Sequence, residues 1–134
     1  MIQVDLTKII IDEKRQDQVI VLKEKDGDRQ IPIVIGFMEA SAIKMKISGI
    51  EVPRPLTHDL LVNVIQAMEG QLVRLVIDKL ETSTFFAKLE VKRPSGETKL
   101  IDCRPSDGIA VAVRTRCPIF VDEEVLNKAS TLKH

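Results

Sequence analysis

Two short segments concentrate the side chains that could do chemistry. Each has an arginine and a proline, followed by a hydroxyl residue and an aspartate where a helix is expected to begin: Arg54-Pro55-Leu56-Thr57-His58-Asp59 and Asp102-Cys103-Arg104-Pro105-Ser106-Asp107. A helix N-terminus beside an arginine can bind phosphate, because free backbone N–H groups and a guanidinium both donate to phosphate oxygens. The segments therefore predict an anion site.

Four carboxylates lie in or near these segments: Glu39, Asp59, Asp102 and Asp107. Carboxylate oxygens are the ligands that Mg²⁺ and Mn²⁺ prefer, and such a cation would activate water and stabilise charge on a phosphoryl group. His58 could act there as a general acid or base, because imidazole exchanges protons near neutral pH. The pattern is thus also compatible with phosphate-ester hydrolysis.

A structural interpretation explains the same residues. Thr57 and Ser106 would cap the two helices, and the aspartates that follow would complement the positive helix ends. The arginines would pair with carboxylates and hold the loops in place. Geometry separates the alternatives: carboxylates around a common point indicate a metal, whereas carboxylates that each bind an arginine indicate a scaffold.

Composition limits the function further. The 134 residues carry 20 Lys+Arg and 20 Asp+Glu, whereas proteins that hold nucleic acid by bulk electrostatics are usually basic. Aromatic residues make up 3%, with no Trp or Tyr, so we expect no base-stacking platform. The sequence lacks a glycine-rich phosphate loop and an HExxH motif. Cys103 and Cys117 have no metal-binding spacing, and we expect reduced thiols.

The sequence favours a cytoplasmic protein without membrane contact. No apolar run approaches the roughly 20 residues that cross a bilayer. Asp5 and Asp12 interrupt the apolar N-terminal stretch, which is atypical of a signal peptide. Only two asparagines occur among many Lys and Glu residues, a composition that leans toward a thermophilic source.

The elements that must position these residues follow a repeated order. Periodicity predicts strands at 2–12, 18–25, 30–36, 71–80, 85–92, 98–102 and 118–121, and helices at 37–48, 57–69, 106–115 and 123–128. Three strands followed by a helix therefore occur twice, which suggests an internal β-β-β-α duplication. Hairpin-length connections predict an α+β fold, with helices packed on a largely antiparallel or mixed sheet, in a single domain over residues 1–134.

Helix faces and helix ends are predicted as well. The run 109–113 should be buried on most sides. Gly49 and Gly70 should end the helices that precede them. The apolar stripe of helix 57–69 should pack on the fold; it comprises Leu60, Leu61, Val64, Ile65 and Met68. The methionines Met38, Met45 and Met68 should fill the core.

Longer matches to both segments make the sequence recognisable. They are Ile31-Pro32-Ile33-Val34-Ile35-Gly36 with Glu39-Ala40, the run RPLTHDLL at 54–61, the run DCRPSDGIA at 102–110, and the weaker Pro118-Ile119-Phe120-Val121. In these stretches the chain resembles the bifunctional nuclease domain family, first catalogued as a bacterial domain of unknown function. This sequence departs from the family at two positions. It has Val34 where the family often has Trp, so a possible stacking surface is missing. It has Gly108 where the family often has Ala, which we expect only to loosen the start of a helix.

The resemblance implies a nuclease that acts on RNA and DNA. Together with the carboxylates, it makes a nuclease of low sequence specificity that uses Mg²⁺ or Mn²⁺ the leading hypothesis. Carried over by position, the catalytic candidates are Glu39, His58, Asp59 and Asp107, the substrate-binding candidates are Arg54 and Arg104, and the metal-binding candidates are Asp59, Asp102 and Asp107. The alternative is a non-catalytic module that recognises a phosphate-bearing ligand or a protein partner, which the neutral charge and scarce aromatics favour.

Two expectations concern arrangement. The duplicated element order predicts that the two Arg-Pro segments meet in space, although 50 residues separate Arg54 from Arg104. A sheet with open edge strands also predicts a homodimer, because pairing across a two-fold axis protects such edges.

Overall fold

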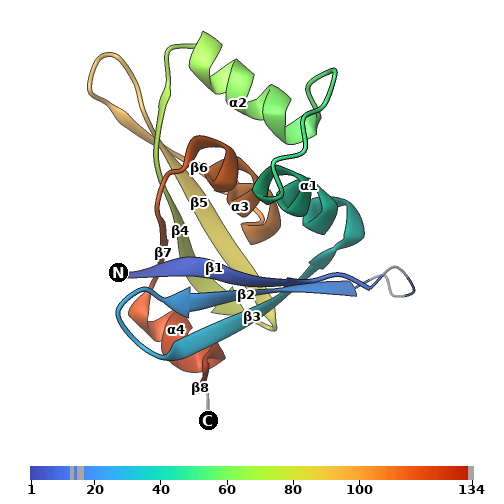
Figure 1. Ribbon diagram of the computed structural model, residues 1–134. Helices are drawn as coiled ribbons and strands as arrows, with labels where there is room; N and C mark the ends of the chain where they lie inside the picture. Colours follow the sequence, from blue (N-terminus) through green and yellow to red (C-terminus); the bar gives the residue numbers. More distant parts are fainter. Residues whose placement is uncertain (13, 15–16, 133–134) are drawn as a thin grey trace.

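The computed structural model describes residues 1–12, 14 and 17–132 and contains one sheet with helices packed on it (Figure 1). The strands are β1 (Ile2–Ile10), β2 (Asp17–Glu24), β3 (Arg29–Gly36), β4 (Gln71–Glu81), β5 (Thr84–Lys92), β6 (Thr98–Cys103), β7 (Ile119–Val121) and β8 (Thr131–Leu132). The helices are α1 (Phe37–Ile47), α2 (Thr57–Ala67), α3 (Pro105–Thr115) and α4 (Glu123–Ala129). Apart from β8, which was not predicted, each element ends within two residues of its predicted bounds.

The eight strands have the order β6-β5-β4-β7-β1-β2-β3-β8. Every neighbouring pair is antiparallel except β4 and β7, which are parallel. The sheet is therefore mixed, and the α+β class is confirmed. No helix in the described ranges is long and apolar enough to span a membrane.

The predicted repeat of three strands and a helix is present in the fold. The units β1-β2-β3-α1 and β4-β5-β6-α3 lie on opposite sides of β7. Because β7 is antiparallel to β1 and parallel to β4, the units run in opposite directions, as a two-fold rotation through β7 would place them. Each unit's helix begins directly after its third strand, so Glu39 and Asp107 occupy equivalent positions in α1 and α3.

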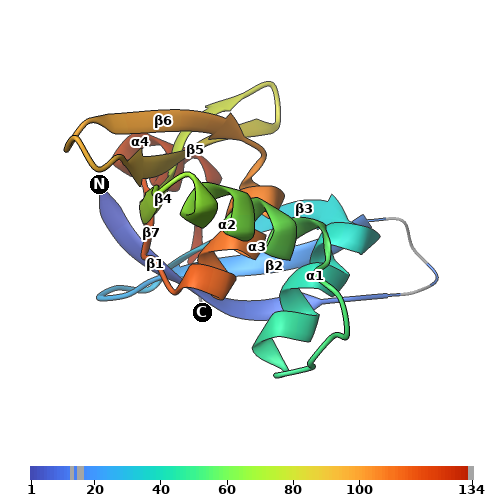
Figure 2. The same cartoon turned by 90° about the horizontal axis from the view of Figure 1, so that it is seen from above.

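Helix α3 lies at the centre of the helical layer, against α1, α2, β4 and β5 (Figure 2). Its apolar run 109–113 is buried except for the half-buried Val113, as predicted. Gly108 does more than loosen a helix start. A Cβ there would lie 2.5 Å from Leu75 Cδ1 and 3.1 Å from Cys103 Sγ, so the missing side chain lets α3 pack closely on β4 and β6.

The prediction for the outer face of α2 is wrong. In α2 only His58 and Val62 are buried. Four residues of the predicted stripe are instead exposed: Leu60, Leu61, Val64 and Met68. The methionine prediction fails with them, since Met38 and Met68 are 76% and 77% exposed. The physical reason is that α3 already occupies the sheet, so α2 forms an outer layer that covers α3 with one narrow side.

The ends of the helices show where glycine is required. Gly49 has φ 71° after α1, as expected of a glycine that terminates a helix. After α2 the left-handed residue is Glu69, with φ 63°, rather than Gly70. Gly70 serves close packing, because a Cβ at that position would lie 2.9 Å from Val91 Cγ1.

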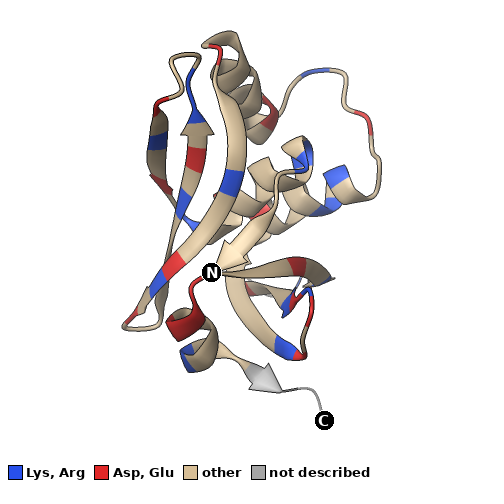
Figure 3. Ribbon diagram, turned by 90° about the vertical axis from the view of Figure 1, so that its left-hand side faces the viewer, with Lys and Arg blue, Asp and Glu red and all other residues tan. Residues whose placement is uncertain are grey.

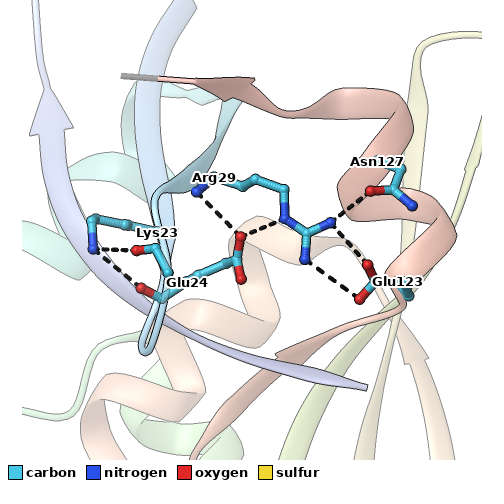
Figure 4. Close-up of polar contacts among 6 residues, drawn as sticks. Lys23, Glu24, Arg29, Glu123 and Asn127 are labelled. Carbon is cyan, nitrogen blue, oxygen red and sulfur yellow. Dashed lines mark hydrogen bonds and ion pairs between the residues drawn. The ribbon is translucent and has the colours of Figure 1, made fainter. Parts of the chain in front are cut away.

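The short helix α4 is fastened to the hairpin of β2 and β3 by one arginine (Figure 4). The Arg29 guanidinium donates to Glu24 beside it, to Glu123 Oε1 at 2.9 Å and to Asn127 Oδ1 at 2.6 Å. These hydrogen bonds raise the pKa of Arg29, so the guanidinium stays charged. The cluster connects the β2–β3 hairpin to the helix α4. These elements carry none of the predicted site residues.

Acidic and basic residues both occur along the strands (Figure 3). Within α2 only Asp59 is an acidic or basic residue with a permanent charge at neutral pH. The mixture of signs agrees with the zero net charge of the sequence.

Candidate functional site

The N-terminal ends of α1, α2 and α3 meet at one place in the helical layer. The third residue of each helix is acidic: Glu39, Asp59 and Asp107. None of the three N-cap side chains accepts a capping hydrogen bond from its helix, since these residues are Gly36, Leu56 and Arg104. The predicted capping by Thr57 and Ser106 is therefore wrong. Three helix ends with partial positive charge converge, and such ends attract anions.

Four of the predicted residues form one hydrogen-bonded chain. His58 Nε2 lies 2.9 Å from Asp107 Oδ1, and Arg104 Nε donates to Asp107 Oδ2 at 2.9 Å. A terminal nitrogen of Arg104 donates to Glu39 Oε1 at 3.0 Å. The prediction that the two Arg-Pro segments meet is confirmed by the link between His58 and Asp107, which lie 49 residues apart.

His58 lines a cavity of about 630 Å³ between α1 and the start of α2, and Glu39 and Arg104 line the same cavity. The histidine is 8% exposed. Because Asp107 is a carboxylate that accepts from Arg104, the shared proton belongs on His58 Nε2, and in the neutral imidazole the lone pair is then on Nδ1. Nδ1 makes no hydrogen bond to a described residue. Among the described residues, the buried side-chain nitrogen or oxygen atom without a partner is Asp78 Oδ1 and not His58 Nδ1, so Nδ1 is in contact with solvent.

Asp59 points away from this chain of hydrogen bonds. Its carboxylate accepts from the backbone N–H of Leu56 at 2.9 Å and from Arg114 Nε at 2.7 Å. The Leu56 N–H and then Arg114 lower the pKa of Asp59. Arg114 is 6% exposed in its side chain and also donates to the carbonyls of Ala110 and Ala42. The pair joins all three helices, which is the structural role that the sequence left open.

The structure places the remaining two candidates outside the cluster. Asp102 is 78% exposed in its side chain, with Lys88 Nζ 3.7 Å from its carboxylate. Arg54 is exposed, and no described residue forms an ion pair with it. It lines a separate hollow of about 540 Å³ next to Asp59 and Arg114.

The predicted metal ligands Asp59, Asp102 and Asp107 do not share a site. Each has its own cationic partner, and the described part of the chain contains no group of three Asp, Glu, His or Cys residues that could hold a metal ion. This donor set fits the scaffold alternative and an anion rather than a divalent cation, because the arginines already neutralise the carboxylates.

The pKa values of Arg104 and Cys103 are both raised by their surroundings. The hydrogen bond from Arg104 to Asp107, helped by Glu39, raises the pKa of the guanidinium, so Arg104 stays charged while most of its side chain faces solvent. Burial raises the pKa of the Cys103 thiol to about 11. Both cysteines are free in the structure, and Cys103 is therefore a protonated, weakly reactive thiol.

Sequence reasoning missed Arg114. The available signal was a basic side chain directly after the apolar run 109–113, one helical turn from Ala110 and on the same face. A cation at that position either reaches solvent or has a partner, and only the tertiary structure supplies Asp59 and Ala42 as partners.

Comparisons with known proteins place the chain in a family. The family model described as bifunctional nuclease domain matches residues 20–134. An uncharacterized protein of Mycobacterium tuberculosis is 39% identical over 130 residues, which cover 97% of this chain and 77% of that protein. Bifunctional nuclease 1 of Oryza sativa subsp. japonica is 32% identical over 110 residues, and bifunctional nuclease 1 of Arabidopsis thaliana is 31% identical over 108.

The matches to these two plant proteins cover 79% and 78% of this chain but only 33% of each plant protein. The family match covers most of the chain and includes His58, Arg104 and Asp107, the residues that the structure joins. The chain therefore belongs to the bifunctional nuclease domain family.

Proposed function

We propose that this protein is a nuclease of low sequence specificity, with His58 as the group that exchanges protons and Arg104 as the phosphate-binding side chain. The observation that carries the proposal is the single carboxylate of Asp107, which contacts both residues at 2.9 Å. It therefore fixes a base and a cation at the wall of one cavity. The names of the plant relatives, which describe bifunctional nucleases, support the same activity.

In this proposal Arg104 and the first-turn N–H groups of the helices bind the non-bridging oxygens of a phosphodiester. His58 Nδ1 accepts a proton from a water molecule, whose oxygen forms the new bond to phosphorus. The bond to the leaving oxygen breaks, and that oxygen takes a proton from solvent. Asp107 keeps the imidazole in the tautomer that this step requires and stabilises the imidazolium that forms.

A requirement for Mg²⁺ or Mn²⁺ stays a prediction. The carboxylates do not converge as metal ligands, so none of the steps above depends on a cation. Comparing cleavage in EDTA with cleavage across a Mn²⁺ titration tests the requirement directly.

The test of function is cleavage of end-labelled single- and double-stranded RNA and DNA by the wild type, His58→Gln and Arg93→Gln. Removal of a general base should lower the rate by about 100-fold or more. Arg93 is an exposed arginine in the turn between β5 and β6, outside the site, so Arg93→Gln should cleave at the wild-type rate and controls for the effect of a surface substitution and of purification. Equal rates for the wild type and His58→Gln would refute the assignment.

A second function is a non-catalytic module that binds a phosphate-bearing ligand. The observation in its favour is that Asp59, Asp102 and Asp107 each have a cationic partner and do not converge on a common point. If the wild type binds labelled strands without cleaving them under any of these conditions, this alternative replaces the nuclease.

We also propose that the chain forms a homodimer. The strand β6 lies at one edge of the sheet and pairs only with β5 among the described strands. Its backbone is open on the other side, and Leu100 and Ile101 are 62% and 42% exposed. An antiparallel partner strand from a second copy would satisfy those backbone groups and cover the apolar side chains.

A further inference from the structure

A second hollow lies directly beside the cavity of His58. It has a volume of about 540 Å³ and is formed by the end of α1, the loop 49–56 and the start of α2. Met45, Pro55 and Leu56 line both this hollow and the His58 cavity. One short wall therefore separates the two, and a chain molecule can occupy both at once.

Some of the charged residues in this hollow form an ion pair and others do not. Its acidic groups are Glu51 and Asp59, and its cations are Lys46, Arg54 and Arg114. Asp59 and Arg114 neutralise each other at 2.7 Å. Lys46 and Arg54 are exposed and form no ion pair with a described residue, although Lys46 interacts electrostatically with Asp59 and Glu51 lines the same hollow. With three cations and two carboxylates in its lining, the hollow carries one net positive charge toward an anionic ligand, and Arg54 and Lys46 are the cations outside an ion pair.

The remaining wall of the hollow is apolar. Ile50, Val52 and Pro53 line it together with the shared residues. A nucleotide presents a phosphate and flat apolar base and sugar surfaces, which match paired cations on an apolar wall. The scissile phosphate would contact Arg104, and the strand would continue over the shared wall toward Arg54.

We infer that Arg54 and Lys46 bind the phosphate next to the scissile one, so that the substrate is a single strand of several nucleotides rather than a mononucleotide ester. This inference rests on the proposed function for the position of the scissile phosphate. Because His58 is 8% exposed at the wall of its cavity, we expect the substrate to enter as a flexible single strand. The inference assigns Arg54 the substrate contact that the sequence predicted and adds Lys46 to it.

Binding tests the subsite without relying on catalysis. The affinity of a labelled single-stranded DNA octamer is measured by fluorescence anisotropy at several salt concentrations, with His58→Gln as the background. Each phosphate contact contributes about 0.7 to the slope of log affinity against log salt for single strands. Adding Arg54→Gln should lower the slope by about that amount, and adding Arg93→Gln should not change it. Equal slopes for the Arg54 and Arg93 variants would overturn the inference.

Chain length gives the second test. In the wild type, kcat/KM should be about tenfold or more higher for an octamer than for a dinucleotide, because only the longer strand reaches the added phosphate contact. The ratio should fall in Arg54→Gln and Lys46→Gln and persist in Arg93→Gln. A ratio that Arg54→Gln and Lys46→Gln leave unchanged refutes the subsite.

The two proposals fail differently. If strands bind with the expected slopes but no chain length is cleaved in a His58-dependent way, the nuclease is refuted while the subsite stands. If cleavage depends on His58 but neither slope nor length ratio depends on Arg54, the subsite is refuted while the nuclease stands.

Discussion

Asp107 has both a structural role and a role in the proposed reaction. One of its oxygens faces His58 and the other accepts from Arg104, and the carboxylate is 28% exposed. A carboxylate is the side chain that can accept from both partners and remain negative. The same atoms therefore hold the start of α3 against α2 and fix the imidazole for proton transfer.

Asp107→Asn separates these roles. The amide keeps the shape, but only its oxygen can accept. If that oxygen keeps Arg104, the NH2 group faces His58 Nε2 and favours the tautomer with the proton on Nδ1; if it faces His58, Arg104 loses its partner. We expect cleavage to slow by about tenfold or more, because the imidazole is no longer held in the tautomer that the reaction requires, and the free energy of unfolding to fall by about 1 kcal/mol. The measurements are the cleavage rate and the urea unfolding midpoint, with the exposed Asp102→Asn as the matched control. A variant that is less stable yet cleaves at the wild-type rate would leave Asp107 a scaffold residue only.

Asp59 gives a pH-dependent prediction. Its pKa is lowered in the folded state, first by the Leu56 N–H and then by Arg114. A lowered folded pKa means that the contribution to stability is present above the unfolded value of about 3.9 and is lost as pH falls from there through the folded pKa. The difference in melting temperature between the wild type and Asp59→Asn should therefore be large near pH 7 and shrink below about pH 4. A difference that stays constant down to pH 3 would show that Asp59 stabilises the fold without its charge.

At the scale of elements, the N-terminal and C-terminal ends of the helices are stabilised in different ways. The starts of α1, α2 and α3 are fixed by side chains from other helices, through Arg104 and Arg114. The C-terminal ends rely on local backbone geometry. Each of α1 and α2 ends with a left-handed residue, and in α2 that residue is Glu69 rather than a glycine.

Glu69→Gly should stabilise the protein. Glu69 is exposed and has φ 63°, a conformation that costs a residue with a Cβ about 1 kcal/mol relative to glycine. The substitution should raise the unfolding free energy by about that amount. Glu69→Ala removes the same charge and keeps the Cβ, so it should give no such gain. Equal midpoints for the two variants in urea unfolding would contradict the explanation.

At the scale of the whole molecule, the sheet determines what is buried and what remains open. Two related units face each other across β7, and their helices meet over the sheet. This arrangement gathers the site from sequence-distant segments. It also leaves β6 at an edge and the outer face of α2 uncovered.

The homodimer can be tested at β6. Light scattering should give twice the monomer mass of 15.0 kDa at micromolar concentration. Ile101→Lys places a charge on the exposed edge strand and should shift the mass to that of the monomer, because an edge charge opposes strand pairing. Lys99→Arg, on the same strand, keeps the charge and should preserve the dimer. A wild-type mass of 15.0 kDa would refute the homodimer.

The sequence by itself determined the elements and their order. Alternation and helical spacing act between neighbouring residues, so the strands and helices were predictable to within two residues. The repeat of three strands and a helix was readable for the same reason, and it indicated that the segments around His58 and Asp107 would meet. Side chains at the starts of these helices were recognisable as candidates from their types alone.

Only the tertiary structure decided which candidates act together. Partner choice depends on helix packing, which brings Arg104 to Glu39 over 65 residues and Arg114 to Asp59 over 55. The packing separates Asp59 and Asp102 from Asp107, although the sequence grouped all three as metal ligands. Burial of α2 was undecidable for a related reason: an apolar stripe indicates that a face can be covered, but the position of α3 on the sheet leaves Leu60 and Val64 exposed.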